Sequence, residues 1–202
     1  MPWLSLSLSD SSQSSARPAR PRRPGVRLEC KISVLLLAFL ATGTAQTRQP
    51  RSAWRVRLRS FGPVRYGMTL AEASRALGEH LEPGKEESEA CSHITPTSIP
   101  PGATLMVIDG RIERVDIDTT GILTASGVQV GSTEEEVQRA YPGQIRVRPH
   151  PDEPGPEWHN LIFVPRNPAD SAFGIIFETD GHRVQSYRAG RRPAVSYIEG
   201  CA

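Results

Sequence analysis

An eleven-residue pattern occurs twice in this chain and limits the folds that its sequence can adopt. Residues 67–77 (GMTLAEASRAL) align without gaps on residues 131–141 (GSTEEEVQRAY), and five positions are identical. The second copy begins 64 residues after the first. Such a repeat indicates one supersecondary unit used twice, because units of this size bury their apolar faces against each other.

Each copy of the pattern predicts the start of a short helix. Thr69 and Glu72 lie three positions apart, and Thr133 and Glu136 repeat this spacing. In the resulting capping box, the Thr hydroxyl accepts a hydrogen bond from the backbone N–H of the Glu, while the Glu carboxylate accepts one from the N–H of the Thr. Glycine or proline directly follows each segment and ends the helix.

Strands joined by Asp-Gly pairs are expected after each helix. Asp109-Gly110 and Asp180-Gly181 suit two-residue hairpins, whose turn residues adopt positive φ angles. The expected strands cover residues 104–108, 111–117, 173–178 and 183–187, with further strands at 54–58, 145–148, 161–164 and 195–198.

Neither half of the chain has enough apolar residues for a core of its own. We therefore expect an α+β fold in which the two halves share one core. Two helix-plus-antiparallel-sheet repeats, about residues 60–125 and 126–202, should form one continuous sheet with both helices on one face.

The two helix starts, Tyr-Gly-Met-Thr at 66–69 and Val-Gly-Ser-Thr at 130–133, resemble the tandem Gly-Met-Thr repeats of beta-lactamase inhibitory proteins. They also resemble the single repeat of the SmpA/OmlA-type outer-membrane assembly lipoproteins, and residues 177–201 look like those of uncharacterised exported bacterial proteins. The resemblance implies a secreted bacterial protein whose curved sheet binds another protein. This chain lacks both the disulfide within each repeat of the inhibitory proteins and the lipidated Cys of the lipoproteins.

The first 45 residues predict an export segment. Residues 32–41 form an apolar run that follows Arg27 and Lys31, and small residues occupy positions 43 and 45. This pattern predicts an N-terminal extension and secretory signal peptide over residues 1–45, cleaved after Ala45, and a single domain over residues 46–202. The alternative is a buried helix. A membrane-spanning helix needs about 20 apolar residues, so we expect a periplasmic or secreted protein that does not span a membrane.

The predicted mature domain is slightly acidic. From Gln46 onward the chain holds 18 Lys or Arg and 20 Asp or Glu. Binding to nucleic acid requires a net basic footprint, so we expect no nucleic-acid partner.

Removal of the signal peptide would also remove Cys30 and leave Cys91 and Cys201. An even pair in an oxidising compartment predicts a disulfide. The alternative, a catalytic Cys91 with His93 as its base, is weaker because residues so close in sequence rarely present a nucleophile and a base correctly.

Four residues within one stretch are metal ligands by type: His150, Asp152, Glu153 and His159. The prolines between them favour a solvated loop, and their spacing fixes no coordination geometry. We therefore predict no metal site, no cofactor and no catalytic residue. A small periplasmic hydrolase or metal-dependent enzyme that uses the two histidines is the alternative function.

Arg55, Arg57 and Arg59 alternate with apolar residues, which predicts a strand with one cationic face. Such a face protects a sheet edge or, alternatively, binds an anionic partner.

The leading hypothesis is an exported, non-enzymatic binding protein that presents an open sheet face to a protein or envelope component. Strand alternation predicts that Arg114, Asp116, Gln185 and Tyr187 lie on this face, because their neighbours include the apolar residues of the same strands.

Overall fold

The computed structural model describes residues 54–85, 90–152, 155 and 157–201. The contacts divide the chain into two units, and all the described residues belong to the second unit, Ala45–Ala202. The predicted signal peptide and its cleavage site at Ala45 lie outside the described residues. No helix among the described residues has the length and apolar character needed to cross a membrane.

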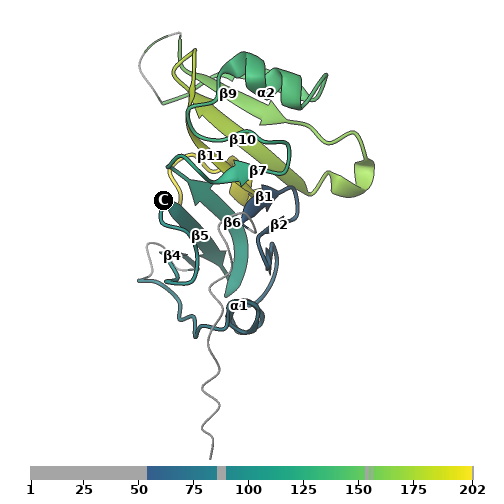
Figure 1. Ribbon diagram of the computed structural model, residues 1–202. Helices are drawn as coiled ribbons and strands as arrows, with labels where there is room; N and C mark the ends of the chain where they lie inside the picture. The colour runs from purple at the N-terminus through teal and green to yellow at the C-terminus, as the bar shows by residue number, and fades with distance from the viewer. Residues whose placement is uncertain (1–53, 86–89, 153–154, 156, 202) are drawn as a thin grey trace, which may run out of the picture. The chain divides into compact units, whose positions relative to one another are not determined.

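The larger of two sheets joins both halves of the chain (Figure 1). Its seven strands follow the order β4-β5-β6-β11-β10-β9-β8, and all neighbours are antiparallel. The strands are β4 (Cys91–Ile94), β5 (Ala103–Ile108), β6 (Arg111–Ile117), β8 (Ile145–Pro149), β9 (His159–Phe163), β10 (Phe173–Thr179) and β11 (Val184–Arg191). The predicted α+β class is confirmed.

A second, four-stranded sheet was not predicted from the sequence. Its order is β3-β2-β1-β7, and its strands are β1 (Arg55–Arg57), β2 (Ser60–Phe61), β3 (Val64–Arg65) and β7 (Leu123–Thr124). The strand expected at residues 54–58 is thus present, but it is shorter and pairs in this sheet. β1 and β7 are parallel and come from distant parts of the chain, so no local pattern predicts their pairing.

Both expected helices are present, α1 (Leu70–Leu77) and α2 (Glu134–Ala140), and each begins with a complete capping box. Thr69 Oγ1 accepts from the N–H of Glu72 at 3.2 Å, and the Thr69 N–H donates to the Glu72 carboxylate at 2.8 Å. The corresponding distances between Thr133 and Glu136 are 3.2 and 2.9 Å.

The two helix starts also bind their hairpins in the same way. The guanidinium of Arg111 donates to the carbonyl of Gly67 at 2.8 Å, and that of Arg183 donates to the carbonyl of Gly131 at 2.7 Å. Thr69 also forms an isolated antiparallel bridge with Arg111, and Thr133 forms one with Arg183. The start of each helix is therefore tied to the hairpin that follows it in the chain.

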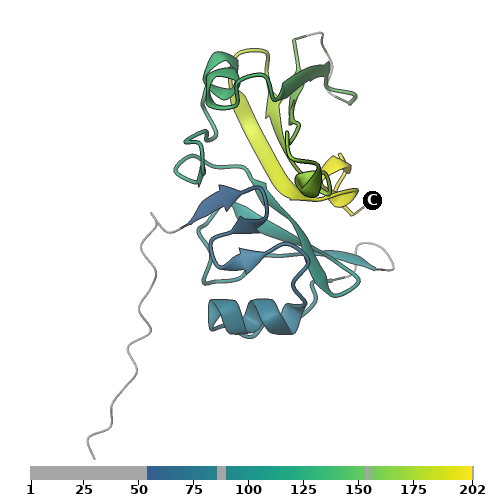
Figure 2. The same cartoon turned by 90° about the vertical axis from the view of Figure 1, so that its right-hand side faces the viewer.

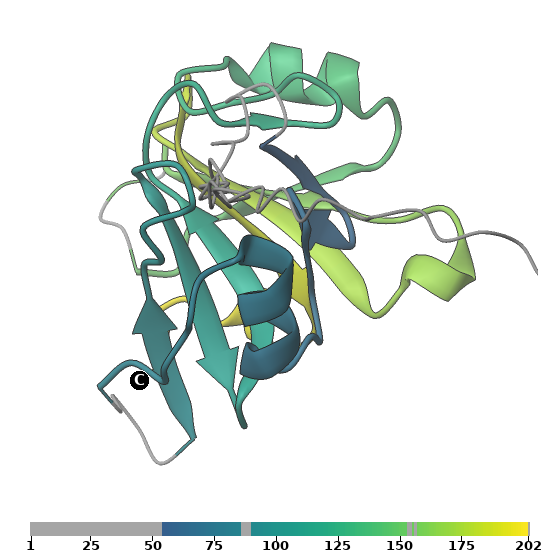
Figure 3. The ribbon, with the colours of Figure 1, turned by 60° about the horizontal axis from the view of Figure 1, so that its bottom comes forward.

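One core lies between the larger sheet, the smaller sheet and the helices. Ala73 of α1 and Val137 of α2 belong to a single cluster of buried residues that also contains Val115 and Phe177 from the central strands. Figure 3 shows α1 lying against β6. Both helices therefore pack on one face of the seven-stranded sheet, and we call the opposite face the outer face.

Each of the two central hairpins contains a β-bulge. Val107 pairs with Ile112 and Met106 pairs with Arg114, so Glu113 is the extra residue. In the second hairpin, Gln185 is the extra residue between two paired positions of β11. A bulge shifts the alternation of side chains by one residue, so residues beyond it change faces.

Two local predictions were wrong. The second Asp-Gly pair does not form a two-residue hairpin, because Thr179 pairs with Val184 and four residues lie between them. The strand expected at residues 195–198 is instead a 3₁₀ helix, η3 (Ala194–Ser196), followed by turns. Figure 2 shows this C-terminal part of the chain on the side of the strands away from α1 and the smaller sheet.

Candidate functional site

Two buried arginines occupy the centre of the outer face. Arg114 of β6 and Arg188 of β11 are only 3% and 5% exposed. Asp116 pairs directly with Arg188 across the two strands, and Gly190 pairs with Arg114. Because alternate residues of a strand share a face, both guanidinium groups lie on the side away from the apolar core.

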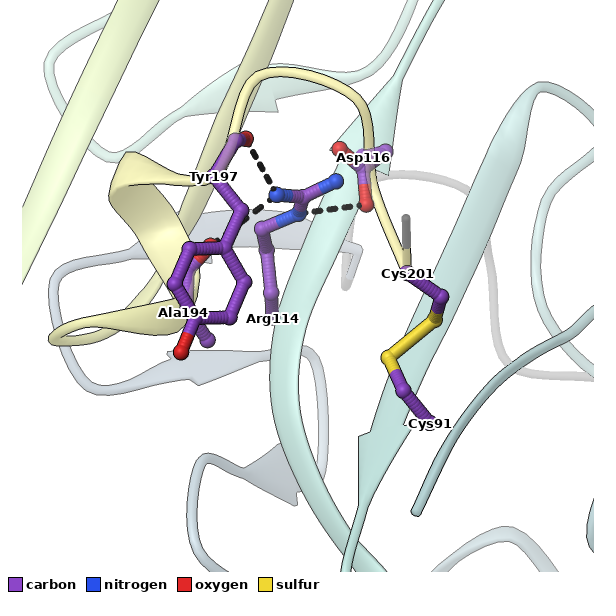
Figure 4. The surroundings of a disulfide bond; sticks show 6 residues. All are labelled: Cys91, Arg114, Asp116, Ala194, Tyr197 and Cys201. Carbon is purple, nitrogen blue, oxygen red and sulfur yellow. Dashed lines mark hydrogen bonds and ion pairs between the residues drawn. A yellow bond between two sulfur atoms is a disulfide. The ribbon is translucent and has the colours of Figure 1, made fainter. Parts of the chain in front are cut away.

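The guanidinium of Arg114 joins β6 to the C-terminal segment, which we define as residues 192–201. Its Nε donates to the Asp116 carboxylate at 2.9 Å, and its Nη1 donates to the carbonyls of Ala194 and Tyr197 at 2.9 and 2.8 Å (Figure 4). The fork of donors on one guanidinium suits this simultaneous binding of three oxygens.

Arg188 makes an equivalent connection from β11. Its Nε donates to the carbonyl of Val195 at 2.8 Å, and its Nη1 forms an ion pair with Glu178 of β10. The Ser186 hydroxyl also donates to the Glu178 carboxylate. Burial by itself raises the pKa of Glu178, but the Arg188 charge and these hydrogen bonds outweigh it and lower the pKa below its usual value.

A disulfide between Cys91 and Cys201 fixes the far end of the C-terminal segment. The two Cα atoms are 5.4 Å apart, and the residues are 8% and 3% exposed. Figure 4 shows the bridge beside the Arg114 contacts. The segment is thus held to β4 by a covalent bond and to β6 and β11 by hydrogen bonds.

The structure corrects the predicted open face. Tyr187 does not lie on it: this residue is 1% exposed, and its hydroxyl donates to the Ile122 carbonyl at 2.8 Å in the core. The physical reason is the bulge at Gln185, which reverses the alternation along β11. Gln185 itself is exposed and donates to Asp180 at 2.8 Å.

Arg114 and Asp116 do lie on the outer face, as the alternation along β6 predicts. Arg114, however, is only 3% exposed beneath the C-terminal segment, and its Nε and Nη1 are already bound to Asp116, Ala194 and Tyr197. The side chain of Asp116 is 32% exposed. The four predicted residues therefore do not form one accessible patch.

His150 and His159, the histidines of the alternative metal or hydrolase site, point to opposite faces. His150 Nε2 lies 3.6 Å from Glu178 on the outer face, whereas His159 Nδ1 lies 2.9 Å from Glu134 at the start of α2. Asp152 is exposed, and Glu153 lies outside the described residues. Among the described residues, no three His, Cys, Asp or Glu side chains are arranged to hold a metal ion.

The buried carboxylate of Glu134 instead joins α2 to two strands of the larger sheet. It accepts a hydrogen bond from the Thr179 hydroxyl as well as pairing with His159. These contacts tie the first residue of α2 to β9 and β10. The carboxylate also lies at a helix N-terminus, where backbone N–H groups favour negative charge.

A shallow hollow of about 140 Å³ opens where the C-terminal segment crosses the sheet. Its lining includes Asp116, Asp118 and Ile198, together with the charged side chains of Arg114, Arg188 and Glu178. Asp118 is exposed, and its carboxylate makes no hydrogen bond or ion pair with any described residue.

Two large apolar side chains of the C-terminal segment face solvent beside this hollow. Tyr197 is 41% exposed and Ile198 is 40% exposed. Figure 4 shows the Tyr197 carbonyl turned toward Arg114 and its ring turned away from that guanidinium. The main chain is therefore held to the sheet while the side chain remains accessible.

Sequence reasoning missed Arg188, Glu178, Tyr197 and Ile198 as members of this site. The last two lie in the segment predicted to be a strand, and a strand would have buried one of them in the sheet. The predicted bridge between Cys91 and Cys201 is the sequence feature that places this segment against the first half of the chain, because it brings the two together.

Comparisons of this chain with protein-family models, curated proteins and solved structures found no match.

Proposed function

We propose that this chain is an exported, non-enzymatic protein that binds another protein of the cell envelope. The observation that carries the proposal is the C-terminal segment, which is anchored by a disulfide and by two arginines but still presents Tyr197 and Ile198 to solvent. A surface that is ordered before binding loses little conformational entropy when a partner docks.

The disulfide supports export. Disulfides persist in oxidising compartments and are rare in the cytosol. The apolar run at residues 32–41 is the segment that would direct export, with cleavage after Ala45.

We also propose that α1-β5-β6 and α2-β10-β11 are two copies of one unit. Three matching features support this proposal: the capping boxes, the arginine contacts to Gly67 and Gly131, and the bulges at Glu113 and Gln185. A duplicated unit is what the resemblance to tandem Gly-Met-Thr repeat proteins requires, and binding of a protein partner is the function that this resemblance implies.

The test is capture from an envelope extract under non-reducing conditions. The full-length chain is produced in cells that process it, then purified and immobilised through an antiserum. We expect it to retain one protein at near one-to-one ratio, whereas the same chain, reduced in denaturant and then blocked with an alkylating reagent, retains none. Equal recovery on the native and denatured chains would overturn the proposal.

A further inference from the structure

We infer, on the basis of the proposed function, that the partner is a protein that places a Lys or Arg side chain in the hollow beside Asp118 and an apolar surface over Tyr197 and Ile198. The assignment follows from the combination, at one place, of a hollow with unpaired negative charge and two exposed apolar side chains on an ordered segment.

The apolar half of this surface is ordered by contacts on both sides of the exposed side chains. Arg114 holds the Tyr197 carbonyl at 2.8 Å, and the bridge at Cys201 follows three residues after Ile198. Aromatic side chains in such settings commonly contribute most of the binding energy of a protein interface. Val147 of β8 is exposed to a similar extent, 44%, but neither of its neighbours is an exposed apolar residue.

The charge of the hollow decides which partner fits. The two guanidinium groups that line the hollow are already paired, Arg114 with Asp116 and Arg188 with Glu178. Asp118 has no such partner among the described residues, so the hollow retains a negative charge. The exposed Glu199 of the C-terminal segment, next to Ile198, adds a second carboxylate to that of Asp118.

The nearest basic group of the C-terminal segment lies away from the hollow. Arg192 is close to the position that a Cβ of Gly174 would occupy, and Gly174 is four residues along β10 from Glu178. Strand geometry makes that separation about 13 Å. A cationic side chain of a partner therefore meets Asp118 without competition from Arg192, whereas an acidic partner would be repelled.

The experiment is site-specific photo-crosslinking in the full-length chain, produced in its native cells. A photoreactive phenylalanine analogue replaces Tyr197 in one variant and Val147, the equally exposed control, in another. The Tyr197 variant is expected to give one discrete adduct, at a yield about tenfold above that of the Val147 variant. Mass spectrometry then identifies the partner and the residues beside the crosslink.

Charge is tested by substitutions in the Tyr197 crosslinking variant. Asp118→Asn is expected to lower the adduct yield about fivefold, and Asp118→Lys to abolish it, whereas Glu82→Gln at an exposed carboxylate elsewhere leaves it unchanged. Replacing the partner's basic residue by Glu should restore the adduct with Asp118→Lys. Unchanged melting temperatures for the Asp118 variants show that folding is not the cause.

The outcomes separate this inference from the function on which it rests. An adduct from Val147 but none from Tyr197 would overturn the inference and leave protein binding intact. The same holds for an adduct from Tyr197 that ignores both Asp118 substitutions. The absence of any adduct from either position, together with failed capture, would overturn both.

Discussion

At the scale of single residues, the buried arginines of the outer face explain how irregular backbone can cover a sheet. The carbonyls of Ala194, Val195 and Tyr197 would lose solvent there, and unsatisfied carbonyls are costly to bury. Arg114 and Arg188 supply the donors, and their own charges are balanced by Asp116 and Glu178. Each buried arginine therefore donates hydrogen bonds to carbonyls that lie on the face of the sheet and have no strand to pair with.

Arg114→Met should lower the free energy of unfolding by about 2–4 kcal/mol, because two carbonyls and the Asp116 carboxylate lose their donor. Urea denaturation followed by circular dichroism measures the change. Arg57→Met, at an exposed position of β1, is the control and should change it by less than about 0.5 kcal/mol. Equal effects of the two substitutions would contradict the role assigned to Arg114.

Buried tyrosines make the protein sensitive to alkali. Burial raises the pKa of Tyr187, with a further contribution from Tyr141, and burial likewise raises the pKa of Tyr66 well above its ordinary value. A raised pKa in the folded state means that the neutral form is favoured by folding. The stability from these groups is thus complete below pH 10 and is lost as the pH rises above it.

We therefore expect alkaline unfolding in which ionisation of the buried tyrosines and loss of structure occur together. Tyrosinate absorbance and circular dichroism, recorded on the same samples through an upward pH titration, test this. Tyr187→Phe should shift the transition to higher pH, although it also removes the hydrogen bond to Ile122. Ionisation of all tyrosines in a fully folded protein would show that the prediction is wrong.

Strand alternation predicts the face of some residues at this site but not of others. Alternation along β6 places Arg114 and Asp116 on the correct face, because it needs only the residues of one strand. The same rule fails at Tyr187, because the bulge at Gln185 depends on how β11 pairs with β10. A bulge is a property of two strands together, and no feature of β11 alone predicts it.

At the scale of elements, the two helices were predicted because their starts are defined by local contacts. Each capping box uses residues three positions apart, so the pattern is readable without any knowledge of the fold. The hairpin around Asp109-Gly110 is equally local, and both residues adopt positive φ angles of 50° and 69°. The pairing of β7 with β1 in the smaller sheet and the placement of η3 depend instead on contacts between distant segments.

Thr69→Ala and Thr133→Ala should each lower the free energy of unfolding by about 1 kcal/mol, because each removes the hydroxyl that accepts from the first turn of its helix. The two effects should be similar, since the two boxes have nearly the same geometry. Chemical denaturation of both variants measures them. Substitution by Ser, which keeps the hydroxyl, is the matched control and should restore most of the loss.

At the scale of the whole molecule, the two ends of the seven-stranded sheet are protected in different ways. At β4, Gly84 lies so close that a Cβ there would come within 2.3 Å of the His93 carbonyl oxygen. At β8, the exposed Arg146 and Arg148 are followed by Pro149, which has no backbone N–H to donate. Charge and proline at an edge strand oppose pairing with a second sheet.

The disulfide acts on the whole domain because it spans 110 residues. The variant with Cys91→Ser and Cys201→Ser should lose about 2–5 kcal/mol of unfolding free energy. A thiol count on the processed, folded protein should find none before reduction and two after reduction in denaturant. Two accessible thiols in the native, unreduced protein would refute the bridge.

The separation of 110 residues between Cys91 and Cys201 also sets the time between their synthesis. Cys91 is synthesised 110 residues before Cys201, which at ordinary elongation rates is an interval of roughly 5–20 s. Throughout that interval the only other cysteine already made is Cys30. If the proposed cleavage after Ala45 removes Cys30 before the interval ends, Cys201 is the sole partner of Cys91, so on this proposal the timing of cleavage contributes to which disulfide forms.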